Sequence, residues 1–292
     1  MPPGNIGVKR LRNARVIAGL LLVFAVLACA VLAPHLAPHD PDEQNLLASL
    51  LPAAWQQGGD PAYLLGTDGL GRDILSRLLY GARVAMTVAI TASLGAALAG
   101  TLMALLAGYL GGWVDWFIGR AVDVWMSFPP VILSLILMTG LGTGLRNVVL
   151  AIVLVDWTRF ARVLRAEVIV VSHRDYVTAA RLVGFSHVRT VLREIVPAII
   201  PLLVTLLTLE AGIAVVVEAI LSFVGLGVKS DQIAWGQMIA DGREAIYQAP
   251  LNLLAPVIAI FLTVTGFNLL GDGLRRALDV RMVEGREVTR PT

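Results

Sequence analysis

The chain has 292 residues, of which 57% are hydrophobic and only 15% are charged. Soluble domains are roughly 45–50% apolar and about 25% charged, so this composition excludes an ordinary soluble protein and predicts an integral membrane protein. The net charge of +2 is too small to indicate nucleic acid binding. The single cysteine, Cys29, excludes an intrachain disulfide or a metal site with several cysteine ligands.

The first apolar segment follows a basic start. Residues 1–15 carry Lys9 and three arginines without an acid, and Val16–Ala33 has no charge. A helix of that length rises about 27 Å, enough for a bilayer core. A cleaved signal sequence is the alternative, because Cys29 lies between two alanines, but the apolar run continues past it. We therefore expect residues 1–33 to be a cytoplasmic N-terminus and an uncleaved first span.

Residues 34–83 form a long polar connection with five prolines and a net charge of −3. Because Lys and Arg collect in cytoplasmic loops, we expect this acidic connection on the extracytoplasmic side, opposite the basic start. Near its end, Asp73–Arg83 has apolar residues at helical spacing. This spacing predicts a short amphipathic helix that leads into the next span.

Residues 84–274 contain the remaining apolar segments, and residues 275–292 are a polar tail that carries several arginines. The second span is rich in Ala and Gly, which lets neighbouring helices approach closely. Six spans in total place both termini on the cytoplasmic side, and the charges of the loops agree. The five further spans that we expect are Val84–Leu110, Val131–Leu141, Val148 to about Arg162, about Ile199–Val224, and Leu251–Leu270.

A basic segment separates the fourth and fifth spans. From Arg159 to Glu194, seven arginines stand against three acids, which marks the cytoplasmic side. The apolar residues between Arg174 and Leu192 predict two short helices that meet at Gly184, with Asp175 near the first helix's N-terminus. An amphipathic helix held on anionic lipid headgroups would show the same pattern, so residue chemistry leaves both interpretations open.

The spacing of Ala179-Ala180, Gly184 and Pro197 resembles the "EAA" signature of the membrane subunits of ABC importers. Thr178 stands where that signature often has Glu, and Val196 where it often has Leu. Four further blocks resemble the dipeptide and oligopeptide permeases, in particular the "C" subunit. These blocks are Leu65–Arg83, Leu221–Gly227, Trp235–Met238 and Phe267–Arg275.

The resemblance implies an all-α membrane protein with six transmembrane helices and the type I ABC importer permease fold. Its coupling segment would be residues 172–197, whose cytoplasmic coupling helices dock on an ATPase subunit. The resemblance assigns this contact to Arg174, Asp175, Tyr176, Thr178, Ala179, Ala180, Arg181, Gly184 and Pro197.

The resemblance also implies the function and the partners. The chain would be a permease subunit of an ATP-driven importer of di- or oligopeptides in the bacterial inner membrane, and would form half of the translocation pore. The expected partners are a homologous second permease, two cytoplasmic ATPases, an extracytoplasmic substrate-binding protein, the peptide and membrane lipid. Nickel and glutathione importers share the same blocks, so these substrates stay open.

The residues themselves argue against an ATPase in this chain. A phosphate-binding loop needs Gly-Lys followed by Ser or Thr, but the two lysines, Lys9 and Lys229, follow valines. We therefore expect no cofactor on this chain, with ATP and Mg on partner subunits. The four histidines lack the spacing of a metal-binding helix; His35 and His39 could make at most a weak contact, so we expect no metal site.

Two acids fall inside the fifth span, Glu210 and Glu218. An acid at mid-bilayer costs roughly 2.5–3.5 kcal/mol on insertion scales, so such residues face protein or water. They are candidates for the translocation path or for a substrate amine. The alternative is that hydrogen bonds inside the bundle or between subunits hold them. We also expect Asp156 to pair with Arg159, one helical turn away.

Two other classes of protein remain possible. An ion-coupled secondary transporter would use Glu210 and Glu218 as ion or proton sites, and its uptake would collapse with the ion gradient. A membrane scaffold or sensor would show no substrate-dependent ATP hydrolysis with partners. Neither class accounts for the blocks that resemble the permease family.

Overall fold

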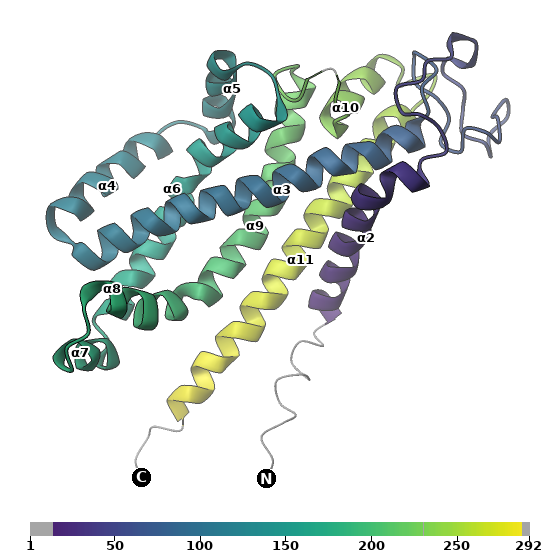
Figure 1. Cartoon of the computed structure of the whole chain (residues 1–292). Coiled ribbons are helices and arrows are strands. Elements are labelled where there is room, and N and C mark those ends of the chain that lie inside the picture. The colour runs from purple at the N-terminus through teal and green to yellow at the C-terminus, as the bar shows by residue number, and fades with distance from the viewer. Residues whose placement is uncertain (1–13, 230, 288–292) are drawn as a thin grey trace, which may run out of the picture.

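The computed structural model describes residues 14–229 and 231–287, with side chains up to residue 276 (Figure 1). Within this part the fold is helical, and its only bridge pairs Thr67 with Asp73. The helices are α2 (Ala14–Leu36), η1 (Leu46–Ala48), α3 (Ile74–Leu105), η2 (Leu106–Leu110), α4 (Gly112–Met126), α5 (Pro130–Leu141), α6 (Leu145–Ser172), α7 (Asp175–Leu182), α8 (His187–Thr190), η3 (Val191–Ile195), α9 (Val196–Phe223), α10 (Trp235–Glu244) and α11 (Leu251–Glu287).

Four described helices are long and apolar enough to cross a membrane: Ala14–Leu36, Ile74–Leu110, His187–Phe223 and Leu251–Arg276. Helices α4 and α5 meet at an angle of 89° and together make a fifth candidate. An all-helical membrane protein with four or five candidate spans is therefore confirmed. The expected third span, 131–141, is too short by itself, because the 12 residues of α5 rise only about 18 Å.

Several predicted boundaries are wrong. The short helix expected at 73–83 is the first part of α3, since no residue there breaks the helix and Gly81 packs against Trp235. The fourth segment does not end near Arg162, because α6 continues to Ser172. For the polar tail expected from residue 275 the sequence predicted no secondary structure, and its residues up to Glu287 continue α11.

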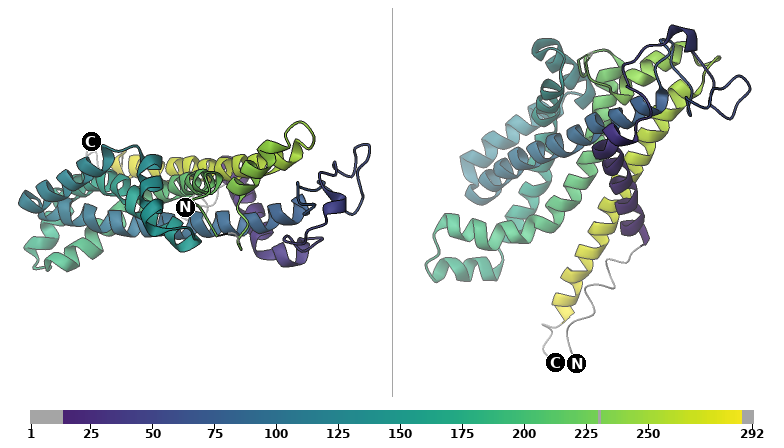
Figure 2. Two further views of the ribbon diagram at one scale, coloured as in Figure 1. Left: turned by 90° about the horizontal axis from the view of Figure 1, so that it is seen from above. Right: turned by 45° about the vertical axis from the view of Figure 1, so that its right-hand side comes forward.

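Helix α3 lies at the centre of the bundle. It packs against α6 and α9 in shared clusters of buried side chains, and also against α2 and α11 (Figures 1 and 2). Ala89, Ala92 and Ala96 on α3 are fully buried, as the small residues of this span predicted. Gly100 lies against the Trp157 carbonyl of α6, where a Cβ would clash with backbone. Small side chains therefore set the spacing of the two helices.

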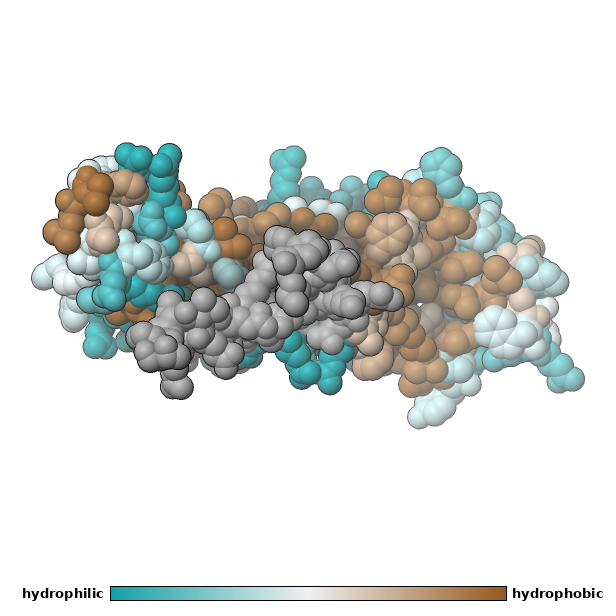
Figure 3. Space-filling model, turned by 90° about the horizontal axis from the view of Figure 1, so that it is seen from below, coloured by the Kyte–Doolittle hydropathy of each residue, from teal (hydrophilic) through white to brown (hydrophobic). Residues whose placement is uncertain are grey.

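The two ends of the bundle carry different structures. Helices α7 and α8 lie at one end, together with the first residues of α2 and the last turns of α11 (Figure 1). The polar connection before α3 and helix α10 lie at the opposite end (Figure 2). Figure 3 looks onto the first of these ends and shows apolar side chains next to polar ones on its surface.

Candidate functional site

The segment between α6 and α9 folds as the sequence predicted. Helix α7 begins at Asp175, and Gly184 follows it with a φ of 94°, in the left-handed region. A Cβ at Gly184 would meet nothing within 4 Å, so glycine is needed there for backbone conformation rather than for space. Ser186 then caps α8 by accepting a hydrogen bond from the Arg189 backbone N–H. Two short helices therefore meet at a glycine turn.

Buried residues and one aromatic contact fix this segment to the bundle. Val177, Thr190 and Ile195 are fully buried. The Tyr109 hydroxyl, at the end of the second span, lies 2.9 Å from Nδ1 of His187. The Arg181 guanidinium lies 5.0 Å from the centre of the same tyrosine ring. The segment is thus held in a defined position at the end of the bundle.

The outer face of α7 and α8 exposes large apolar side chains within a basic segment. Leu182 and Val183 are 84% and 80% exposed, and Val188 is also well exposed. Arg181 and Arg189 flank them. Exposed apolar groups with a polar rim are typical of a surface that contacts another protein. We call Leu182, Val183 and Val188 with these two arginines the coupling surface, after the role that the sequence analysis expects for this segment.

The residues assigned to ATPase coupling are mostly accessible. Val177, between two of them, points inward instead. Thr178 donates its hydroxyl to the Arg174 carbonyl at 3.4 Å, inside its own helix. Exposed members of the predicted set are Asp175, Tyr176, Thr178, Ala179, Arg181, Gly184 and Pro197, while Arg174 and Ala180 are half-buried.

The two acids of the fifth span are buried in α9 and hydrogen-bonded. Glu218 accepts a hydrogen bond of 2.6 Å from Ser222, one turn further along. Glu210 accepts one of 3.0 Å from Nη1 of Arg159, on α6. Among the described ion pairs, Arg159 is joined to Glu210 and not, as expected, to Asp156; the buried Asp156 carboxyl lies beside Glu210 and interacts with Arg159 only electrostatically.

Two further arginines of α6 pair with acids of α4. Arg162 lies 2.5 Å from Asp123, and Arg165 makes a two-pronged contact with Asp115. These four side chains line a cleft of about 360 Å³ between the helices. Sequence reasoning missed the pairs, because Asp115 and Arg165 are 50 residues apart and belong to helices whose packing had to be known first.

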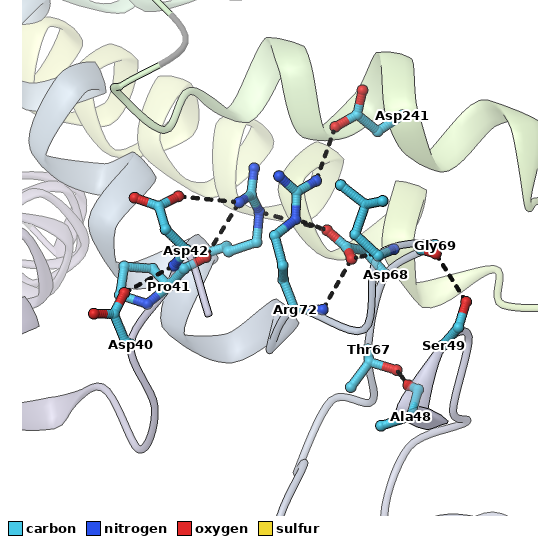
Figure 4. Close-up of polar contacts among 12 residues, drawn as sticks. Asp40, Pro41, Asp42, Ala48, Ser49, Thr67, Asp68, Gly69, Arg72 and Asp241 are labelled. Atoms are coloured by element: carbon cyan, nitrogen blue, oxygen red, sulfur yellow. Dashed lines mark hydrogen bonds and ion pairs between the residues drawn. The ribbon is translucent and has the colours of Figure 1, made fainter. Parts of the chain in front are cut away.

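A second charged cluster lies at the opposite end of the bundle (Figure 4). The Asp68 carboxylate accepts hydrogen bonds from the backbone N–H groups of Leu70 and Arg72 and, at 2.6 Å, from Nε of Arg72. Arg72 also reaches Asp241 on α10 at 3.5 Å, and the buried Arg77 lies 3.7 Å from Asp68. The polar connection is thereby tied to both α3 and α10.

The start of α3 is capped by the same stretch. Asp73 accepts hydrogen bonds from the backbone N–H of Ser76 at 2.9 Å and from its hydroxyl at 2.6 Å. Asp is a favoured residue at a helix N-cap, and the helix start that the sequence predicted at Asp73 is confirmed. Among the described residues, no group of three or more His, Cys, Asp or Glu side chains has an arrangement that could hold a metal ion.

The described part of the chain is thus a multi-helix membrane bundle with an exposed basic and apolar segment at one end. Residues 96–284 match the family of binding-protein-dependent transport system inner membrane components, and residues 9–53 match the N-terminal transmembrane domain of oligopeptide transport permease C. The chain therefore belongs to the family of binding-protein-dependent transport system inner membrane components. It is a permease subunit rather than a catalytic one.

Curated relatives are similar over nearly the whole chain. The dipeptide transport system permease protein DppC of Escherichia coli is 43% identical over 93% of this chain and 90% of its own length. The di/tripeptide transport system permease protein DppC of Pseudomonas aeruginosa is 38% identical over 92% of this chain and 89% of its own. The nickel transport system permease protein NikC of Escherichia coli is 40% identical over 90% of this chain and 93% of its own length.

Proposed function

We propose that this chain is the permease subunit of an ATP-driven importer of dipeptides or oligopeptides, and that it forms one half of the translocation pore. The similarity to the peptide permeases of two bacteria over more than nine-tenths of the chain carries this proposal. The second permease, the two ATPases and the binding protein are separate subunits in this proposal, and ATP and Mg bind to the ATPases.

The proposed topology has six spans: α2, α3, the bent pair α4–α5, α6, α9 and α11. Helix α6 has too many charges to count as a span by composition. Its arginines are nevertheless paired with Glu210, Asp123 and Asp115, which lowers the cost of placing them at membrane depth. An even number of spans places the start of α2 and the end of α11 on the same side of the membrane, and the arginines of the segment between α6 and α9 favour the cytoplasm for that side.

In the proposed mechanism, the coupling surface transmits ATP binding to the pore by alternating access. Residues Asp175–Gly184 would lie in a groove of an ATPase subunit, and closure of two ATPases would carry α7 and α8 with them. An ATPase shifts the pore only by binding its two states with different affinity. Exposed Leu182 and Val183 suit such a contact, since they supply apolar area that water would otherwise cover.

Reconstitution tests this proposal. The chain would be assembled in vesicles with its second permease, ATPases and binding protein, and ATP hydrolysis and uptake would be measured with a dipeptide and with Ni²⁺. Stimulation by the dipeptide but not by Ni²⁺ is the expected result. Stimulation by Ni²⁺ alone would favour the nickel alternative, for which the similarity to NikC argues. Uptake that needs an ion gradient and no ATPase would overturn the proposal.

Two matched variants, each with an acid introduced, test the contact between α7 and the ATPase. Ala180→Asp places a carboxylate on the half-buried face of α7, whereas Ala62→Asp changes an exposed alanine of the polar connection at the opposite end of the bundle. We expect Ala180→Asp to abolish dipeptide-stimulated ATP hydrolysis while the chain still reaches the membrane. Normal uptake by this variant would exclude α7 as the ATPase contact.

A further inference from the structure

The ion pair of Arg159 and Glu210 lies at the middle of two long helices. Helices α6 and α9 each have 28 residues, and each of the two charged residues is fourteen places after the first. At 1.5 Å per residue, both lie about 20 Å from either end of their helix. If these helices cross the membrane, the pair is at mid-bilayer depth.

The three members of this cluster are not equally accessible. Glu210 is 1% exposed, and Asp156 is also buried. The Arg159 side chain, in contrast, is 38% exposed on the surface of the chain. Because a charge at the bilayer centre is costly, an exposed guanidinium there must face water or protein rather than lipid. This face of α6 is therefore directed toward the interior of the assembled transporter.

The residues that follow Arg159 on α6 share its face. Val163, Ala166 and Val170 lie within about 40° of Arg159 around the helix, and all three are exposed. The exposed stripe therefore runs from mid-depth toward α7. On the far side of α6, Leu154 is also exposed, but it lies about 140° away from Arg159 around the helix.

The chemistry of the exposed group selects its ligand. A guanidinium presents five N–H donors in a planar fork that matches a carboxylate, and among the described ion pairs only Glu210 engages Arg159, through Nη1. The acids of the cluster are buried behind it, so an approaching solute meets the arginine first. Asp156 and Glu210 hold the guanidinium in place and moderate its attraction for an anion, which suits a ligand that must be released.

We propose that Arg159 faces the substrate path at mid-membrane depth and binds the carboxylate of the peptide in transit, with Glu210 and Asp156 as positioning residues. This inference rests on the proposed function and adds to it a residue that the sequence analysis expected only in a pair with Asp156. The Oε1 atom of Glu210 is buried without a hydrogen-bond partner, so an acceptor is available to the guanidinium when the peptide carboxylate leaves.

Labelling of an introduced cysteine tests whether position 159 faces water. Cys29→Ala removes the single cysteine of the chain. Arg159→Cys or Leu154→Cys is then introduced, each with Asp156→Asn and Glu210→Gln so that neither buried acid of the cluster is left unpaired. In the reconstituted complex, a charged water-soluble methanethiosulfonate should label the thiol at position 159 and leave position 154 unlabelled. Absence of labelling at position 159 would mean that the second permease or lipid covers it, and this would overturn the proposal.

Uptake kinetics test whether Arg159 binds the carboxylate of the peptide. Arg159→Gln should raise the apparent KM for the dipeptide alanyl-alanine by about tenfold or more, as expected for loss of a charged hydrogen bond. Arg159→Lys should retain part of the affinity. The triple variant Arg159→Gln/Asp156→Asn/Glu210→Gln separates the two roles of the arginine. If Arg159 only neutralises the two buried acids, the triple variant regains the wild-type KM, and the proposal is wrong; continued loss supports carboxylate binding.

The failure of this inference can be distinguished from failure of the proposed function. If the wild-type complex couples dipeptide uptake to ATP hydrolysis but Arg159 is inaccessible or dispensable, the proposed carboxylate site is rejected and the importer function stands. A wild-type complex that shows no dipeptide-stimulated hydrolysis rejects the function itself.

Discussion

Tyr109 and His187 are 78 residues apart in sequence, and a hydrogen bond of 2.9 Å joins the tyrosine hydroxyl to Nδ1 of the imidazole. Tyr109 lies in η2, the π-helical turn that ends the second span, and His187 is the first residue of α8. Arg181 of α7 stacks on the same ring. A single side chain therefore contacts both short helices of the coupling segment and connects them to the long central helix.

The first prediction concerns this tyrosine. Tyr109→Phe removes the hydrogen bond and keeps the ring beneath Arg181, so it should cost about 1 kcal/mol of local stability. Tyr109→Ala removes both contacts and should cost more. In reconstituted complex, dipeptide-stimulated ATP hydrolysis should fall in the order wild type, Tyr109→Phe, Tyr109→Ala. Equal stimulation in all three would show that the tyrosine does not transmit the movement of α7 and α8.

The second prediction concerns the glycine turn. Gly184→Ala should cost about 1–2 kcal/mol, because an L-residue is strained at its positive φ although the space is open. Gly140→Ala is the matched control, since it also has open space but lies in α5 without a positive φ. Affinity of detergent-solubilised permease for its ATPase should fall for Gly184→Ala and not for Gly140→Ala. Identical affinities would contradict a conformational role for Gly184.

The third prediction concerns the contact of α3 with α6. Gly100→Ala places a Cβ against the Trp157 carbonyl and Phe160, where backbone must move, so it should destabilise the bundle by about 1–3 kcal/mol. Gly119→Ala, inside α4 with nothing within 4 Å, should be neutral or slightly stabilising. Thermal unfolding in nanodiscs measures both. A loss for Gly119→Ala as large as that for Gly100→Ala would exclude helix spacing as the cause.

Local patterns in the sequence were sufficient for the long apolar helices and for the turn at Gly184, but they predicted neither α4 nor α10. Apolar runs, the Gly111-Gly112 pair and Pro129-Pro130 indicate where the helices begin and end, because each acts on its own backbone. Boundaries failed where charge was the only signal: Arg159 and Arg162 suggested a loop, but α6 continues through them, since acids of other helices neutralise them.

The charged contacts themselves were beyond the reach of sequence reasoning. Arg159 was paired with Asp156 because the two are one turn apart, whereas its hydrogen-bond partner is Glu210, 51 residues further along. Such partners depend on which helices pack together and at what rotation. A helical pattern shows which face of a helix is apolar, but it does not identify the helix that packs against that face.

The last prediction compares two acids of the outer cluster. Asp68 lies between Arg72 and Arg77, and Asp68→Asn keeps an acceptor for the two backbone N–H groups but leaves both arginines without its charge. Breaking a buried pair in this way should cost about 3 kcal/mol. Limited proteolysis of the polar connection in nanodiscs should therefore be much faster for Asp68→Asn.

Asp241 should behave differently, although it also contacts Arg72. Burial raises the pKa of its carboxyl above the ordinary 3.8, and Arg72 and Arg77 only partly oppose the shift. The folded chain thus binds this proton more readily than the unfolded one, so stability falls as the pH rises from about 3.8 through the raised pKa. Asp241→Asn should remove that pH dependence and leave the cleavage rate at neutral pH unchanged or slower. Faster cleavage of Asp241→Asn than of wild type at neutral pH would mean that its ion pair with Arg72 outweighs the cost of burial.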